Sequence, residues 1–126
     1  MVEKREVANT KVAGSLNARE QSLELAEQVV LLLRERQQTL SLAESCTGGR
    51  LSAAITSVSG ASQIFLGSFV TYANELKEKF LFVSASLLKT MGAVSLPVAK
   101  AMAHGARKQT NSVWSVAVTG IAGPSG

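Results

Sequence analysis

Apolar residues recur at helical spacing near the amino-terminal end of the chain. Between Leu23 and Leu33 they follow one another every three or four positions, with charged residues on the other faces. This period predicts a helix over 20–37. Residues 1–18 mix charged and polar types without such a period, so we expect a flexible leader there and a single domain over 19–126.

Three short segments have the apolar, β-branched or aromatic character of strands. They are TLSLA at 39–43, GSFVTYA at 67–73 and VWSVAVTG at 113–120. The third segment is apolar almost throughout. We therefore expect it to be buried on both faces of a sheet.

Helical segments separate these strands. We expect helices at 48–56, from Asn74 as N-cap, at 84–91 after the cap Ser84, and at 95–110 with Ser95 and Pro97 at its start. Alternation of this kind predicts an α/β fold: a three-layer α/β/α sandwich with helices on both faces of a mixed, largely parallel sheet. A site is then expected at the carboxyl ends of the strands.

The amino-acid composition limits the kind of ligand and the cellular location that we expect. Hydrophobic residues make up 46% of the chain and charged ones 17%, as in globular proteins. The longest apolar run, VVLLL at 29–33, is too short to span a membrane, and the start lacks the apolar core of a secretory signal, so we expect a cytoplasmic protein. The net charge of +4 comes from scattered basic residues with only 5% aromatics, which favours an anionic small molecule over nucleic acid.

The residue types present exclude several kinds of chemistry. One cysteine, Cys46, rules out an internal disulfide or a multi-cysteine metal site, and the chain has no aspartate. The single histidine, His104, shares a helix face with Lys100 and Lys108, where we expect it to be solvated. We expect no metal, since its ligands would have to come from scattered glutamates such as Glu44.

The segment LAESCTGGR at 42–50 joins the first predicted strand to a helix. It lacks the spacing and the lysine of a phosphate-binding P-loop. Ser45 precedes a helix N-terminus, where free N–H groups favour a developing anion. Gly48 and Gly49 each cost a helix about 1 kcal/mol, which suggests clearance for a ligand. The alternative is a capping turn in which Ser45 or Thr47 satisfies backbone donors.

A nucleophilic serine needs a base, and Lys77 is the candidate. It lies in the first turn of a predicted helix, where the helix dipole disfavours a cation and favours a neutral, proton-accepting amine. The alternative is an exposed lysine paired with Glu75 or Glu78. Tyr72 ends the second strand and could relay a proton, orient the lysine or simply cover the core. Cys46 is a rival nucleophile that we expect to be a small packed residue.

The third loop, TGIAGPSG, supplies another set of backbone donors. Thr119 and the N–H groups from Gly120 to Gly123 could form a second anion cradle. Position 126 lies within this glycine-rich loop, so we expect the carboxyl-terminal part of the fold to be missing.

Three segments together resemble the motifs of the CinA carboxyl-terminal domain family, the nicotinamide-nucleotide amidases. They are AESCTGGRLS at 43–52, FVTYANELK at 69–77 with GAVSLPVA at 92–99, and VTGIAGPSG at 118–126. The resemblance runs from about residue 20 to the end. It implies hydrolysis of the carboxamide of nicotinamide mononucleotide to nicotinate mononucleotide and ammonia, in pyridine-nucleotide salvage, without a metal or other cofactor.

The resemblance also implies catalytic roles. The Ser/Lys/Tyr arrangement of the family falls on Ser45, Lys77 and Tyr72: the serine attacks the amide carbon, the lysine takes its proton and passes it to ammonia, and the tyrosine supports that transfer. N–H groups around Thr47, Gly48 and Gly49, and the loop with Thr119, Gly120 and Gly123, would hold the oxyanion or the substrate phosphate.

The family often reads GAVSE where this chain has Leu96 after GAVS. Its members also continue beyond the GIAGP loop. We expect a homo-oligomer that covers apolar edges. The alternative function is a catalytically inactive nucleotide-binding or protein-interaction module of the same family, and a nucleic-acid binder comes third.

Overall fold

The computed structural model describes residues 16–124. Most of the predicted leader, residues 1–15, and the last two residues of the third loop lie outside this described range. The elements within it are α1 (Ala18–Arg36), β1 (Leu40–Glu44), α2 (Arg50–Thr56), the 3₁₀ helix η1 (Ala61–Gln63), β2 (Phe65–Val70), α3 (Asn74–Leu81), α4 (Ala85–Met91), α5 (Leu96–Thr110) and β3 (Trp114–Val118).

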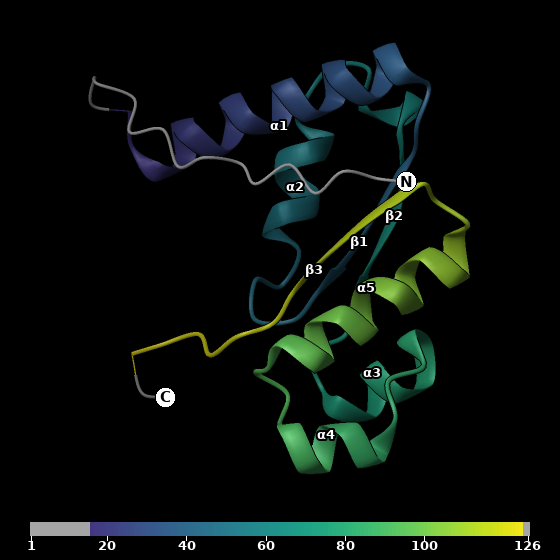
Figure 1. The fold of residues 1–126 in the computed structure, drawn as a ribbon. Helices are drawn as coiled ribbons and strands as arrows, with labels where there is room; N and C mark the ends of the chain where they lie inside the picture. Colours follow the sequence, from purple (N-terminus) through teal and green to yellow (C-terminus); the bar gives the residue numbers. More distant parts are fainter. Residues whose placement is uncertain (1–15, 125–126) are drawn as a thin grey trace.

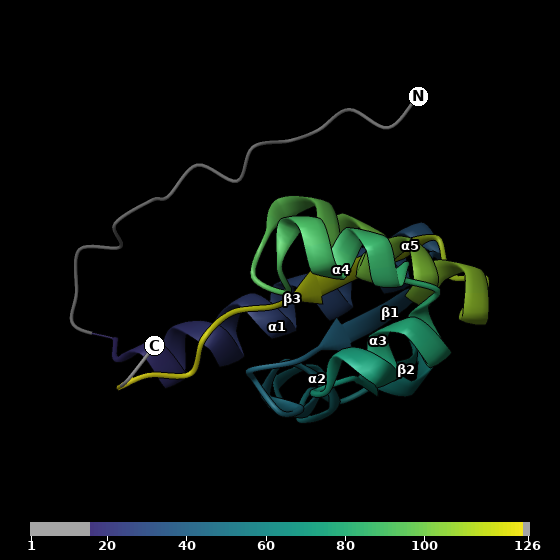
Figure 2. The same ribbon diagram turned by 90° about the horizontal axis from the view of Figure 1, so that it is seen from below.

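The three strands form a parallel sheet in the order β2-β1-β3, with β1 in the centre. Glu44 at the end of β1 pairs with Val70 on one side and with Val118 on the other. The carboxyl ends of all three strands therefore lie at the same edge of the sheet. Helices α1 and α2 cover one face and helices α3, α4 and α5 lie on the other, so the predicted three-layer fold is confirmed (Figures 1 and 2).

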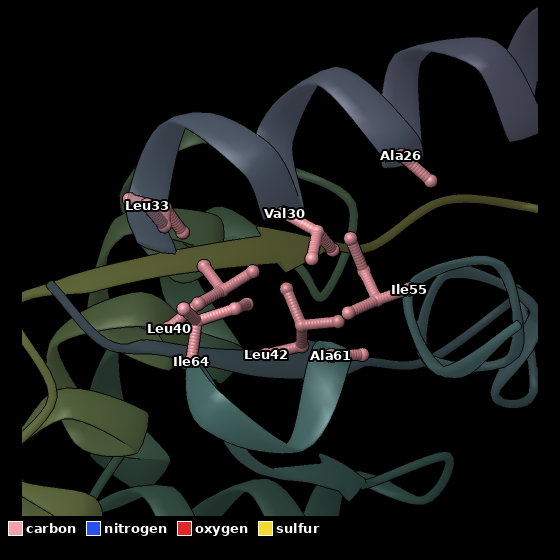
Figure 3. Packing of buried hydrophobic residues seen from close by; sticks show 8 residues of the cluster. All are labelled: Ala26, Val30, Leu33, Leu40, Leu42, Ile55, Ala61 and Ile64. Carbon is pink, nitrogen blue, oxygen red and sulfur yellow. The ribbon is translucent and has the colours of Figure 1, made fainter. Parts of the chain in front are cut away.

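Two hydrophobic clusters hold the layers together, one on each face of β1. Figure 3 shows the first, in which Leu40 and Leu42 of β1 meet Val30 of α1 and Ile55 of α2. Ala43 points the other way, into a second cluster built mainly by α3, α4 and α5. Side chains of a strand alternate between its faces, which is why neighbouring residues of β1 belong to different clusters.

Helix α1 begins at Ala18, two residues before the predicted start. The Asn17 side chain accepts a hydrogen bond from the Glu20 N–H at 2.9 Å, and the Glu20 carboxylate accepts one from the Asn17 N–H at 3.2 Å. This reciprocal capping box is visible in the sequence as Asn-x-x-Glu. Residues 17 and 18 therefore belong to the helix start and not to a leader.

The second strand was predicted two to three residues too late. It was expected at 67–73, but β2 starts at Phe65, which pairs with Leu40 at the beginning of β1. It stops at Val70 because β1 itself ends at Glu44. The last bond across this pair runs from the Thr71 N–H to the Glu44 carbonyl, at 2.8 Å.

The predicted N-cap of the following helix was also wrong. Ala73 occupies the N-cap, without a side-chain cap, and Asn74 is the first helical residue of α3. The other two predicted caps are confirmed. The Ser84 hydroxyl accepts a hydrogen bond from the Leu87 N–H at 3.0 Å, and Ser95 caps α5 with Pro97 in its first turn.

The expectation that the third strand is buried on both faces is wrong. Val116 of β3 is 46% exposed. It pairs with Leu42, so it faces the side of α1 and α2, while Ala117, which pairs with Ala43, packs against the α5 side. Within the described residues β3 is an edge strand, which explains the partial cover. None of the helices in residues 16–124 is long and apolar enough to cross a membrane.

Candidate active site

The site begins where β1 ends. Ser45 follows the last residue of the central strand, and Thr71 and Tyr72 follow β2 at the same edge. Because side chains alternate along a strand, Glu44 lies on the α2 side with Leu42, and Ser45 lies on the α3 side with Ala43. The side chains of these two adjacent polar residues thus point to opposite faces of the sheet.

Lys77 meets Ser45 across this edge. Its Nζ lies 3.0 Å from the Ser45 Oγ, although the two residues are 32 positions apart. The lysine is only 1% exposed, which excludes the alternative of a solvated lysine paired with neighbouring glutamates. The first turns of α3 direct its side chain inward from the loop that follows β2.

Two backbone carbonyls complete the surroundings of the amine. Lys77 Nζ donates to the Thr71 oxygen at 2.7 Å and to the Tyr72 oxygen at 3.0 Å. The ammonium form donates its third hydrogen to the Ser45 Oγ. After loss of that proton, a neutral amine keeps two hydrogens for the carbonyls and turns a lone pair toward the Ser45 hydroxyl. The same three contacts therefore hold the amine in both protonation states, and in the neutral state its lone pair can accept the proton of Ser45.

Burial lowers the pKa of Lys77, because removal from water disfavours the charged ammonium. The electrostatic effect of the nearby Cys46 acts in the opposite direction, but the effect of burial is larger. A lowered pKa increases the fraction of neutral amine at a given pH. Burial thus favours the neutral amine, and the contacts of Nζ leave its lone pair directed at Ser45.

The Glu44 carboxylate is the main polar group on the other side of β1. It is fully buried and accepts hydrogen bonds from the Thr47 hydroxyl at 2.8 Å, the Leu51 N–H at 2.8 Å and the Ser52 N–H at 2.9 Å. The Ser52 hydroxyl also donates to it, and the Ser68 hydroxyl lies at 3.5 Å. Burial would raise the pKa of Glu44, but these hydrogen bonds together lower it.

The contacts of Glu44 show that the predicted alternative of a capping turn named the wrong residues. The sequence suggested that Ser45 or Thr47 could satisfy the donors of α2, yet Glu44 does so and Thr47 donates to it. Sequence reasoning considered this glutamate only as an inadequate metal ligand. A carboxylate within a few residues of a helix start was the available signal.

The two glycines lie before α2 and not inside it. Gly48 has φ +61° and Gly49 has φ +112°, conformations that glycine adopts without strain. A Cβ at Gly48 would meet nothing within 4 Å. The backbone conformation of the turn therefore requires the glycines, and the predicted helix over 48–56 begins only at Arg50.

Backbone donors near Ser45 remain available. The N–H groups of Leu51 and Ser52 are taken by Glu44, and the Gly48 N–H donates to the Ser45 carbonyl at 3.0 Å. Within residues 16–124, the N–H groups of Cys46, Thr47 and Gly49 form no hydrogen bond. The predicted substrate-binding turn thus keeps free donors beside the serine.

Tyr72 contributes its backbone to the site, while its side chain faces outward. The side chain is 68% exposed, and its hydroxyl forms no hydrogen bond with any described residue. His104 is likewise exposed on α5, as predicted. Among the predicted catalytic residues, the structure brings Ser45 and Lys77 side chains together and leaves the Tyr72 ring at the surface.

The third loop reaches the first at Gly120. A Cβ on Gly120 would lie 3.2 Å from the Sγ of Cys46, which is half-buried next to Ser45. The Thr119 hydroxyl donates to the Ala93 carbonyl at 2.8 Å and so ties the loop to the segment between α4 and α5. Gly123 is exposed, and the described end of the chain after β3 leads away from the sheet (Figures 1 and 2).

A family model described as the CinA C-terminal domain matches residues 22–126, which is most of the chain. The chain belongs to the CinA C-terminal domain family. A CinA-like protein of Synechococcus sp. (strain RCC307) is 55% identical over 102 residues, and one of Parasynechococcus marenigrum (strain WH8102) is 54% identical over 102 residues. Each alignment covers 81% of this chain and 24% of the relative.

Solved CinA structures share the fold. A competence/damage inducible protein from Agrobacterium tumefaciens is 40% identical, with a TM-score of 0.82, over 90% of this chain and 67% of its own. A CinA superfamily protein from Escherichia coli is 34% identical, with a TM-score of 0.83, over 90% and 66%. The chain thus spans about a quarter of its curated CinA relatives and about two thirds of these solved chains.

Proposed function

We propose that this chain hydrolyses the carboxamide of nicotinamide mononucleotide, giving nicotinate mononucleotide and ammonia by a Ser/Lys mechanism. The observation that carries the proposal is the buried 3.0 Å contact between Ser45 Oγ and Lys77 Nζ. Membership of the CinA C-terminal domain family supports it, since the motifs that this chain shares with the family imply a nicotinamide-nucleotide amidase.

The first half of the reaction forms an ester. Ser45 Oγ attacks the amide carbon while its proton passes to Lys77 Nζ. The tetrahedral intermediate then collapses, the carbon–nitrogen bond breaks, and the Lys77 ammonium gives its proton to the departing nitrogen. Ammonia leaves, and the nicotinoyl group remains bound to Ser45.

The second half reverses the roles. Lys77, neutral again, takes a proton from water as the water oxygen attacks the ester carbon. Collapse of the second intermediate breaks the ester bond, and Lys77 returns the proton to Ser45. The carbonyls of Thr71 and Tyr72 hold the amine in place through both halves.

Backbone donors would stabilise the negative charge that develops on the carbonyl oxygen. We assign this role to the turn with Thr47, Gly48 and Gly49, in which the N–H groups of Thr47 and Gly49 are free and that of Gly48 donates to the Ser45 carbonyl. The loop with Thr119, Gly120 and Gly123 is the proposed second substrate-binding segment, because Gly120 packs against Cys46. We propose that the exposed Tyr72 ring supports proton transfer from the rim of the site.

The test is ammonia release from nicotinamide mononucleotide by the purified chain. Ser45→Ala should lower kcat by roughly 1,000-fold or more while the far-ultraviolet circular dichroism stays unchanged. Cys46→Ala is the matched control, a neighbouring nucleophile that should be dispensable. Saturable binding of nicotinamide mononucleotide without ammonia release would contradict the proposal and favour the inactive nucleotide-binding alternative.

A further inference from the structure

One buried titratable group has no part in the proton transfers proposed above. The Glu44 carboxylate is fully buried, and it belongs to the residue that immediately precedes the nucleophile. Both of its oxygens accept hydrogen bonds, so it is tied into the structure on all sides. A group so placed can control where Ser45 lies.

The bonds of Glu44 span the turn that carries Ser45. On one side its carbonyl accepts the Thr71 N–H at 2.8 Å, which fixes the end of β1 against β2. On the other side its carboxylate holds Thr47, Leu51 and Ser52, within and after the turn. The intervening residues 45–49 are therefore closed into a loop whose two ends are joined by one side chain.

Apart from Glu44, the turn is held by two local backbone hydrogen bonds, from the Gly48 N–H to the Ser45 carbonyl at 3.0 Å and from the Arg50 N–H to the Thr47 carbonyl at 3.1 Å. Gly48 and Gly49 have unrestricted backbones, and α2 is a short helix. Without the Glu44 bonds, the N–H groups of Leu51 and Ser52 would need other partners, and the turn could adopt other conformations. The carboxylate is thus the side chain that ties this turn to the start of α2.

We infer that Glu44 is a positioning residue, whose buried carboxylate clamps the turn so that the Ser45 hydroxyl meets Lys77 Nζ. It acts through Ser45 and does not touch the substrate. The kinetic part of the inference rests on the proposed hydrolysis, whereas the geometric part does not.

The chemistry of the donors makes Glu44→Gln the sharpest variant. Every partner of the carboxylate is an N–H or O–H donor, and the amide NH₂ of glutamine would face donors on one side. The shape is kept while at least one bond becomes a donor against a donor. We expect the Ser45 Oγ to Lys77 Nζ distance to exceed roughly 3.5 Å and kcat to fall about 100-fold with little change in KM.

Ser41→Ala is the matched control for a loss of stability alone. Ser41 is a buried residue toward the opposite end of the same strand, and its hydroxyl lies 2.8 Å from that of Ser112. This variant should unfold at a lower temperature while the Ser45 to Lys77 distance and kcat stay at wild-type values. A role of Glu44 in stability alone predicts the same pattern for Glu44→Gln.

The experiment combines crystal structures of the two variants with two rates. The first rate is ammonia release from nicotinamide mononucleotide, and the second is acetylation of Ser45 by p-nitrophenyl acetate, followed by mass spectrometry. If the wild type releases no ammonia but Glu44→Gln slows acetylation and lengthens the distance, the proposed function fails and the inference stands. If folded Glu44→Gln keeps the distance and both rates, the inference is overturned, whatever the substrate.

A second variant covers the case in which Glu44→Gln does not fold. Ser52→Ala removes one hydroxyl donor to the carboxylate and leaves the Ser52 N–H bond in place. We expect acetylation of Ser45 to be roughly 10-fold slower in this variant than in the wild type. The effect is smaller than in Glu44→Gln because only one of the hydrogen bonds to the carboxylate is lost. A wild-type acetylation rate in folded Ser52→Ala would overturn the inference.

Discussion

At the scale of single residues, the site depends on which side chain is charged. Lys77 and Glu44 are both buried, yet burial decides the direction of the pKa shift only for the lysine. The hydrogen bonds that Glu44 accepts outweigh its loss of water, whereas Lys77 donates to carbonyls that are neutral. The structure therefore holds an anion on one side of β1 and favours a neutral base on the other.

The pH dependence of the reaction follows from Lys77. Burial lowers its pKa from the ordinary value of 10.5, and only the neutral amine accepts the serine proton. We expect kcat/KM to rise as pH increases, with a midpoint below 10.5. A pH–rate profile measures this. Lys77→Arg, whose guanidinium does not deprotonate, should remove activity at every pH, and a wild-type profile that stays flat would contradict the assignment.

The stability of the protein in acid follows from Glu44. Its pKa in the folded state lies below the ordinary value of 4.5. The stabilisation it provides is therefore complete above that value and is lost as pH falls through the folded pKa. Urea unfolding at several pH values should show this decline in the wild type and a shallower one in Glu44→Gln. The exposed Glu24→Gln should follow the wild-type curve, and so would Glu44→Gln if the carboxylate were irrelevant.

The sequence predicted the Ser45 and Lys77 pair from the place of Lys77 in a first helical turn and from the motifs of the family, and the carboxyl ends of the strands gave the expected place of the site. It could not predict the partners of Lys77, since backbone carbonyls carry no sequence signal. It also could not assign Glu44 to the α2 side before the exact ends of β1 were known. A shift of one residue would have exchanged the faces.

At the scale of elements, the contact between α3 and α5 positions the base. A Cβ at Gly105 of α5 would lie 2.0 Å from the Leu81 carbonyl oxygen, at the end of the helix that carries Lys77. The two backbones approach so closely that no side chain fits between them. The amine is thus held in place partly by packing at the far end of α3.

Gly105→Ala should destabilise the fold. Alanine favours a helix interior by about 1 kcal/mol relative to glycine, but the obstructing atom is backbone and cannot rotate away. We expect a net loss of roughly 1–3 kcal/mol in the free energy of unfolding, measured by urea denaturation. Lys100→Ala, on the exposed side of the same helix, should stay within about 0.5 kcal/mol of the wild type. Equal or greater stability of Gly105→Ala would refute this interpretation of the contact.

The elements themselves were largely predictable. The bounds of helices that begin with a side-chain cap, such as α4 and α5, were predicted to within one residue. Their caps, Ser84 and Ser95, accept hydrogen bonds from specific backbone N–H groups. Strand limits were not, because the pairing of β2 ends where β1 ends, and this is a tertiary property. The burial of β3 was overestimated for the same reason. Its apolar composition does not show that it lies at the edge of the described sheet, where one side lacks a neighbouring strand.

At the scale of the whole molecule, apolar residues remain exposed along one side of α1, next to its buried side. Leu25, Val29 and Leu32 are spaced along one side of the helix and are 55%, 38% and 45% exposed. The expected self-association stays a prediction, and this surface gives it a physical reason. Sedimentation velocity over a wide concentration range should show a mass that increases with concentration. Leu25→Lys with Leu32→Lys should reduce that increase, and a constant monomer mass in the wild type would contradict it.

The alternation of side chains along β1 has a consequence for insertions and deletions. The Glu44 side chain contacts α2 and the Ser45 side chain contacts α3, because successive side chains along a strand point to opposite faces. Their roles therefore depend on the exact number of residues in the strand. Removal of one residue from the strand would turn the carboxylate toward the lysine and the serine toward α2. Variation in length within this lineage should therefore collect in the loops around β1 and avoid the strand itself, even where substitution there is tolerated.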